Sequence, residues 1–199
     1  MERTILATGI GGQGIQLATQ VLARAAMGEG REVMLFGSYG GMMRGGNTDT
    51  ALVLADGPVS APPVPPAGWA GVVMHHDYMA PTVAKLPPGA LAFVNTSVVT
   101  DLDAFAGRQV VGVAATDVAV DTGGILTASM VMTGALAAAT GLVAVESLEQ
   151  AVADALPPYR RQHVERNVAA LRAGAALFAG SPLAPAWPGE RTGAVARVG

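Results

Sequence analysis

The sequence of 199 residues contains no cysteine, and only 14% of its residues are charged. The absence of cysteine excludes a disulfide, a thiolate nucleophile and an iron–sulfur cluster ligated by this chain. So low a charge content favours a protein that covers part of its surface with partners or with further copies of itself. The formal net charge of −3 argues against nucleic-acid binding, which usually requires a basic surface.

A basic leader followed by a long apolar region is also missing, so we expect no signal peptide and a cytoplasmic protein. One uncharged stretch, residues 125–145, is long enough to cross a bilayer. It is diluted by serine, threonine and glycine and lacks flanking basic or aromatic anchors. We therefore expect a buried helix that breaks at Gly141, with no contact to a membrane.

Short apolar runs alternate along the chain with segments of helical periodicity. The runs predict six strands, at 4–8, 32–37, 48–55, 71–75, 90–95 and 110–115. Helices are expected at 15–26, 77–86 and through most of the last third, where Ser147 and Gln150 have capping-box spacing and 164–178 is amphipathic. This alternation predicts a doubly wound, Rossmann-like α/β domain over 1–180, with a mostly parallel sheet and helices on both faces. An irregular tail, 181–199, is expected to be disordered or to lie on a partner.

The stretch GIGGQGIQ, residues 9–16, puts four glycines at the turn from the first strand into the first helix. The spacing Gly9-x-Gly11-x-x-Gly14 fits a dinucleotide-binding fingerprint, in which pyrophosphate meets free amides at a helix start. That fingerprint also requires an acidic residue at the end of the second strand, whereas Glu32 lies at its beginning. Tight helix–strand packing is the alternative explanation of these glycines.

The stretch GSYGGMMRGGNTD, residues 37–49, contains five glycines around Arg44. A guanidinium among backbone amides suits a phosphate or a carboxylate, which it can bind through two hydrogen bonds. In a doubly wound sheet, the loops after the first and second strands are expected to adjoin at the carboxyl edge and to form one rim. The alternative is an interface loop whose arginine pairs with another subunit.

Together the two loops resemble the gamma subunit of the 2-oxoacid:ferredoxin oxidoreductases. The resemblance covers residues 4–179 and includes FVNTS at 93–97, which is similar to the family's strand-end Asn-Ser-Ser. Gly41 and Met42 stand where the family usually has Pro-Glu, and Ser129 stands where it usually has Asn. The family's motifs Gly-x-Gly-Gly-Gln-Gly and Ser-Tyr-Gly-Pro-Glu-Met-Arg-Gly-Gly are matched by Gly9, Gly11, Gly12, Gln13 and Gly14, and by Ser38, Tyr39, Gly40, Met43, Arg44, Gly45 and Gly46.

The resemblance implies a subunit that contributes no catalytic residue to the oxidative decarboxylation of a 2-oxoacid to its acyl-CoA. Thiamine diphosphate is implied between partner alpha and beta subunits, and iron–sulfur clusters on other chains, such as a ferredoxin-like subunit. This chain would support assembly and bind coenzyme A. The Met-Arg-Gly-Gly form of its second loop resembles the 2-oxoglutarate and branched-chain 2-oxoacid branches of the family more than the pyruvate branch, and of the two we favour 2-oxoglutarate. The expected cofactor-binding residues are Gly9, Gly11, Gly12, Gln13, Gly14, Ser38, Tyr39, Arg44, Gly45, Gly46, Asn47 and Asn95.

Other readings stay open. The chain could be a free-standing NAD(P)- or nucleotide-binding module, or a structural subunit whose glycine loops bind nothing small. His75 and His76 follow a predicted strand, and because adjacent side chains of extended chain point to opposite faces, we expect no metal site there. His163 is expected on a solvated flank beside Arg160, and neither glycine-rich loop contains a histidine that could serve as a base.

Overall fold

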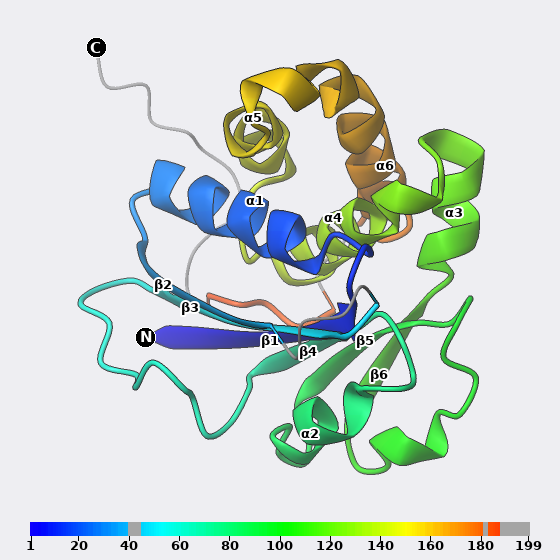
Figure 1. The fold of residues 1–199 in the computed structure, drawn as a ribbon. Coiled ribbons are helices and arrows are strands. Elements are labelled where there is room, and N and C mark those ends of the chain that lie inside the picture. The colour runs from blue at the N-terminus through cyan, green and yellow to red at the C-terminus, as the bar shows by residue number, and fades with distance from the viewer. Residues whose placement is uncertain (40–44, 181–182, 188–199) are drawn as a thin grey trace.

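The computed structural model describes residues 1–39, 45–180 and 183–187. The expected site residue Arg44 lies outside the described residues, as do the side chains of Ser38 and Tyr39. All six expected strands form a single sheet in the order β2-β3-β1-β4-β5-β6 (Figure 1). The strands are β1 (Glu2–Ile10), β2 (Glu32–Tyr39), β3 (Asn47–Ala55), β4 (Ala70–Val73), β5 (Leu91–Asn95) and β6 (Gln109–Val113).

The sheet is mixed. Strands β4, β5 and β6 continue from β1 in parallel, whereas β3 is antiparallel to both β1 and β2. All strands except β3 therefore run in one direction, and the expected α/β class with a mostly parallel sheet is confirmed. The second glycine-rich loop is the turn of the β2–β3 hairpin, and the pairing of Ile10 with Asn47 brings this turn to the carboxyl end of β1.

Helices lie on both faces of the sheet, but unequally (Figure 1). The short α2 (Met79–Ala84) covers one face, and five longer helices form a layer on the other. Short 3₁₀-helices, η1 (Asp103–Phe105), η2 (Ile125–Thr127) and η3 (Pro158–His163), connect the elements. The longer helices are α1 (Ile15–Gly28), α3 (Ala115–Thr122), α4 (Ala128–Thr140), α5 (Val145–Ala155) and α6 (Val164–Ala176).

The inner strand β5, between β4 and β6, shows why its sequence is apolar without alternation. Leu91 and Phe93 belong to the large core beneath the five-helix layer, and Ala92 and Val94 belong to a smaller core on the α2 side. A strand that is covered on both faces must be apolar at every position. The two cores thus cover β5 on both faces of the sheet.

Helix α4 corresponds to the uncharged stretch of the sequence. Every residue of α4 except Ala138 is buried, and the helix ends at Gly141, which adopts the left-handed conformation with φ 61°. A Cβ added to Gly134 would collide with the Leu171 carbonyl of α6, so the two helices cross with their backbones in contact. The expectation of a buried helix that breaks at Gly141 is confirmed, and none of the described helices is both long and apolar enough to span a bilayer.

The expected capping box is wrong. Helix α5 begins at Val145, so Ser147 lies inside its first turn and makes no capping hydrogen bond. The N-cap residue Ala144 instead donates its N–H to Glu29 Oε1 at 2.7 Å, a carboxylate at the far end of α1. Long-range contact, not a local motif, fixes this helix start.

Residues 183–187 of the tail are irregular and pack against the chain itself. Ala186 N–H donates to the Thr140 carbonyl at 2.7 Å, and Trp187 Nε1 donates to the Leu142 carbonyl at 2.9 Å. The Arg31 guanidinium stacks over the Trp187 ring, 3.9 Å from its centroid. This part of the tail therefore covers the C-terminal end of α4.

Candidate functional site

The two glycine-rich loops adjoin at the carboxyl end of β1. Gly11 N–H donates to the Gly46 carbonyl at 2.8 Å, and a Cβ added to Gly11 would lie 3.3 Å from the Gly45 nitrogen. The loops are close enough for main chain to touch main chain, as expected for a common rim. We call Gly9–Gly14 and Gly45–Asn47 together the glycine rim.

The glycines of the first loop serve different purposes. A Cβ on Gly9 would lie 2.6 Å from Gln13 Oε1, and one on Gly14 would lie 2.7 Å from Ser129 Oγ. With Gly11, these positions are explained by close packing within the chain. Gly12 differs, because its φ is +103° and a Cβ there would have no described neighbour within 4 Å. Within the first loop, only Gly12 presents its bare backbone to open space; in the second loop Gly45 does so as well among the described residues, with a φ of +83°.

Gln13 closes the first loop internally. Its Oε1 atom accepts the Ile10 N–H at 2.9 Å, and its Nε2 atom donates to the Met74 carbonyl at 3.2 Å. The side chain therefore ties the end of β1 to the end of β4. Gln13 shapes the rim and has both ends of its amide occupied by the chain.

Asn95, expected to face a ligand, is completely buried. Its Nδ2 atom donates to Thr116 Oγ1 at 2.9 Å and to the Met74 carbonyl at 3.4 Å, and its Oδ1 atom accepts the Thr116 N–H at 3.3 Å. These bonds join the ends of β4 and β5 to the first turn of α3. In this conformation the amide of Asn95 has no surface left for a ligand.

Polar groups without partners gather at the start of β3. Asn47 Nδ2 donates to Asp49 Oδ2 at 2.6 Å, whereas Asn47 Oδ1 and Asp49 Oδ1 are buried and have no hydrogen-bond partner among the described residues. Buried acceptors usually find a donor, because an unsatisfied one costs about 1–3 kcal/mol. Asp49 was not among the expected site residues.

A cleft of about 360 Å³ opens beside the glycine rim. Its walls are Gly11, Gly12 and the first turn of α1 on one side, and the α5–η3 connection, Ala155–Pro157, on the other. Arg160 is the only charged residue among the described ones that line it. The volume is within the range of small-ligand sites.

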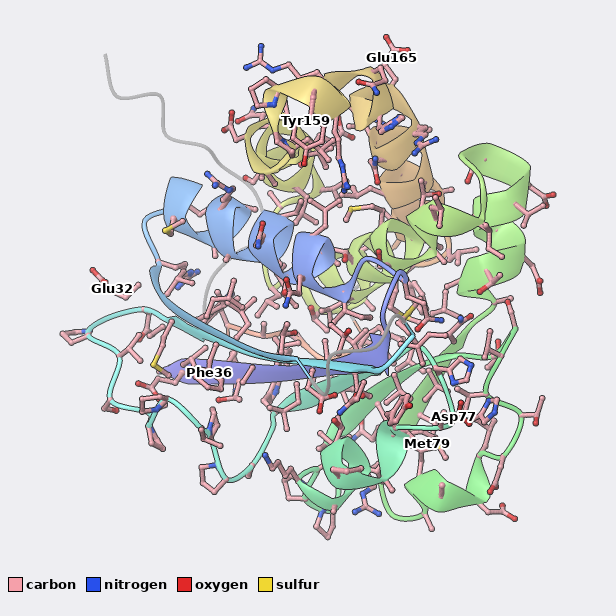
Figure 2. The ribbon with its side chains drawn as sticks, viewed as in Figure 1. Glu32, Phe36, Asp77, Met79, Tyr159 and Glu165 are labelled. Atoms are coloured by element: carbon pink, nitrogen blue, oxygen red, sulfur yellow. The ribbon has the colours of Figure 1, made fainter. Side chains whose placement is uncertain are left out.

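The electrostatics of the cleft favour an anion. Helix α1 has no acidic residue in its first turn and no side-chain cap, so the positive end of its dipole is not offset locally. Arg160 supplies a full positive charge from the opposite wall, near the exposed Tyr159, which Figure 2 shows on the helical side of the sheet. The sequence had suggested only a solvated flank for Arg160.

The position of Glu32 weighs against a nicotinamide site. Glu32 pairs with Ala55, as does Glu2 at the start of β1, so its carboxylate belongs to the amino edge of the sheet. Figure 2 shows Glu32 and Asp77 at opposite ends of the molecule. A ribose bound at the glycine rim would be out of its reach.

The expected arrangement of the two histidines is wrong. Strand β4 ends at Val73, so His75 and His76 are not in extended chain and the alternation of faces does not apply. Their rings stack, with centroids 4.3 Å apart and planes inclined by 25°.

Comparison with known proteins identifies the family. The family model for pyruvate ferredoxin/flavodoxin oxidoreductases matches residues 4–177. The 2-oxoglutarate synthase subunit KorC of Methanothermobacter thermautotrophicus is 33% identical over 185 residues, which cover 89% of this chain and 96% of that protein.

Solved structures agree. The gamma subunit of a keto/oxoacid ferredoxin oxidoreductase from Geobacter sulfurreducens is 28% identical, with a TM-score of 0.74 over 88% of this chain and 95% of that one. A 2-oxoglutarate:ferredoxin oxidoreductase from Magnetococcus marinus, at 17% identity, shows the same fold with a TM-score of 0.80, over 94% of this chain and 32% of its own. The resemblance drawn from the two loops is confirmed: the chain belongs to the pyruvate ferredoxin/flavodoxin oxidoreductase family and is a gamma subunit of a 2-oxoacid:ferredoxin oxidoreductase.

Proposed function

We propose that this subunit binds coenzyme A in a complex that oxidatively decarboxylates 2-oxoglutarate to succinyl-CoA, and that it performs no covalent chemistry. The observation that carries the proposal is the cleft between the glycine rim and Arg160. Open amides at a helix start and a guanidinium are the groups that proteins use to bind phosphates. Apolar residues of the same cleft, Ile10, Ile15 and Leu156, suit the uncharged part of coenzyme A.

The rim would supply further contacts. Gly12 N–H and the amides of the first turn of α1 border the cleft. Asn47, at the end of the rim, has a buried Oδ1 atom without a partner among the described residues, so a ligand reaches it only if this side chain turns toward the cleft. Gln13 and Asn95 take part only by holding the ends of β1, β4 and β5 in place.

Thiamine diphosphate and the iron–sulfur clusters belong, in this proposal, to partner alpha and beta subunits and to a ferredoxin-like subunit. A chain without cysteine cannot ligate such a cluster through thiolates, so the electrons must leave through other chains. The contribution of this chain to the reaction is to bind and orient the acyl acceptor.

Exposed apolar side chains support a contact with those partners. Val120, Ile125 and Leu126 are 60%, 61% and 63% exposed, and they lie on α3 and η2, beside the start of α4. Grouped large apolar side chains on a surface mark protein–protein contacts more often than isolated ones do. We propose that α3 and η2 form part of the interface with the thiamine-binding subunits.

The test is purification of the complex from native extract through this chain. We expect thiamine-containing subunits to co-purify and the complex to reduce a viologen dye with 2-oxoglutarate only when coenzyme A is present. Recovery of the chain alone would contradict the assembly. Equal or faster turnover of pyruvate would contradict the substrate, and dye reduction independent of coenzyme A would contradict its role as acyl acceptor.

A further inference from the structure

The segment His75–Asp77 leaves the sheet at the carboxyl end of β4 and is held at both ends. Met74, just before it, donates its N–H to the Thr8 carbonyl at 3.0 Å, and its own carbonyl accepts Gln13 Nε2 at 3.2 Å. Tyr78, just after it, accepts a hydrogen bond from Thr8 Oγ1 at 3.3 Å. The three residues therefore form a short bridge with fixed ends, which limits the conformations of their side chains.

The three side chains of this bridge converge. His75 Nδ1 lies 3.5 Å from one carboxylate oxygen of Asp77, and His76 Nε2 lies 3.2 Å from the other. All three ligand-type atoms are within 4.8 Å of one another.

We propose that His75, His76 and Asp77 form a binding site for a divalent transition-metal ion of the Zn²⁺ type. Zinc binds imidazole nitrogen and carboxylate oxygen at about 2.0–2.2 Å, so tetrahedral ligands stand about 3.4 Å apart. Each of the two nitrogens lies near this distance from one oxygen of the Asp77 carboxylate, and one ligand atom from each residue lies within 4.8 Å of the others. Two imidazoles and one carboxylate favour zinc, nickel or copper over magnesium and calcium, which prefer oxygen ligands alone.

The Asp77 N–H donates to His75 Nδ1 at 3.2 Å, so this nitrogen acts as an acceptor. An ion that binds here replaces this hydrogen bond with a metal–nitrogen bond. His76 and Asp77 are 55% and 56% exposed, which gives the ion a route from solvent and leaves its fourth position open to water or to another ligand.

The proposed metal site is separate from the cleft proposed to bind coenzyme A. It lies one residue beyond the Met74 carbonyl that Gln13 binds, and therefore beside the glycine rim but on a different strand end. Figure 2 shows Asp77 at the carboxyl end of the sheet, away from Tyr159. Neither proposal depends on the other.

The test uses the full, untagged chain after treatment with a chelator and dialysis. Zinc is titrated by calorimetry, and Co²⁺ is titrated by the visible d–d absorption that a nitrogen-containing tetrahedral site produces. We expect one ion per chain in both experiments and a higher melting temperature with zinc. Even loss of an outer-shell partner weakens metal binding about 10–100-fold, so His76→Ala and Asp77→Asn are each expected to weaken it by at least about tenfold.

His163→Ala, which removes the remaining histidine of the chain, is the matched control and should bind as the wild type does. Far-UV circular dichroism establishes that each variant is folded. Absence of saturable heat and of a d–d band in the wild type would overturn the proposal. So would unchanged affinity in the folded His76→Ala variant, or an equal loss in His163→Ala, since either would show that the ion binds elsewhere.

Discussion

Gly14 of the glycine rim lies so close to Ser129, at the start of α4, that a Cβ on Gly14 would be 2.7 Å from the serine Oγ atom. Gly14 also has a φ of +79°, a conformation that residues with side chains rarely adopt. The starts of α1 and α4 can approach each other this closely only because one of the two residues has no side chain. This contact distinguishes Gly14, a glycine required by packing, from Gly12, which faces open space.

Gly14→Ala is expected to destabilise the chain more than Gly12→Ala. Both substitutions place a side chain at positive φ, at a cost of about 1–3 kcal/mol. Gly14→Ala adds overpacking against Ser129, typically about 1–3 kcal/mol more, whereas Gly12 has no described neighbour to meet. Urea unfolding measures both values. The double variant Gly14→Ala/Ser129→Ala should regain only the part of the unfolding free energy that was lost to overpacking. Equal losses of unfolding free energy in Gly12→Ala and Gly14→Ala would contradict this assignment.

Arg160→Ala is expected to raise the half-saturating concentration of coenzyme A by about one to two orders of magnitude, since a charge-assisted hydrogen bond contributes about 1.5–3 kcal/mol. The neighbouring Arg161→Ala is the matched control, because Arg161 does not line the cleft. The melting temperature of both variants should stay close to that of the wild type. A similar loss in both would indicate a general charge effect, and no loss in Arg160→Ala would remove this residue from the site.

Arg44 is a sequence-based candidate for the same ligand. We predict that Arg44→Ala and Arg44→Lys both impair use of coenzyme A or assembly, because a lysine lacks the planar fork that binds phosphate or carboxylate through two hydrogen bonds. Arg24→Ala, on the exposed side of α1, serves as the control. Full activity of Arg44→Lys would show that only the charge matters at this position.

Leu126→Ser is expected to weaken the complex with the thiamine-binding subunits without changing the stability of the isolated chain, because Leu126 is 63% exposed. Val64→Ser is the matched control, since Val64 is 58% exposed and lines the groove on the α2 side of the sheet. Size-exclusion chromatography of the reconstituted subunits reports assembly. Stronger disruption by Val64→Ser would move the interface to that other face.

The ion pair between Glu149 of α5 and Arg172 of α6 should make stability depend on pH. Arg172 Nε and one of its terminal nitrogens each donate to the carboxylate at 2.6 Å, and these bonds hold the pKa of Glu149 below its ordinary value. A lowered pKa in the folded state stabilises the fold above the ordinary glutamate pKa of about 4.3, and this contribution disappears as the pH falls through the lowered value.

Glu149→Gln should accordingly reduce the free energy of unfolding slightly at pH 7, and this difference from the wild type should shrink as the pH falls through the lowered pKa of Glu149, as measured by urea unfolding at each pH. Glu146→Gln, also in α5, is the control. A difference between Glu149→Gln and the wild type that persists at the acidic end would show that the pair acts through packing and not through charge.

The strands could be predicted because a buried strand must be apolar, and their positions followed directly from the apolar runs. Their directions could not, since nothing in the loop around Arg44 distinguishes a hairpin from a crossover. Ser147 illustrates another limit: its spacing from Gln150 imitates a cap, while the group that binds the start of α5 is Glu29, distant in sequence.

The candidate site likewise has features that the sequence predicts and one that it does not. The glycine loops follow from local sequence, because tight turns at positive φ require glycine. The role of Arg160 does not follow from local sequence, because its place in the cleft depends on how the α5–η3 connection folds back over α1. The prediction for the histidine pair is wrong for a local reason: side chains alternate between faces only within a strand, and both residues lie past the last residue of β4.

The antiparallel β3 between β1 and β2 sets how the two glycine loops are spaced. Their separation is fixed by the hydrogen-bond ladder, with Ile10 opposite Asn47 and Tyr39 opposite Thr48, and not by the sizes of core side chains. The helical layer meets this rim closely at Gly14, against Ser129 at the start of α4, while the ladder itself is made of strand backbone. Homologous chains that keep this ladder and a glycine at position 14 should therefore keep the same distance between the two loops, even where other helix contacts differ.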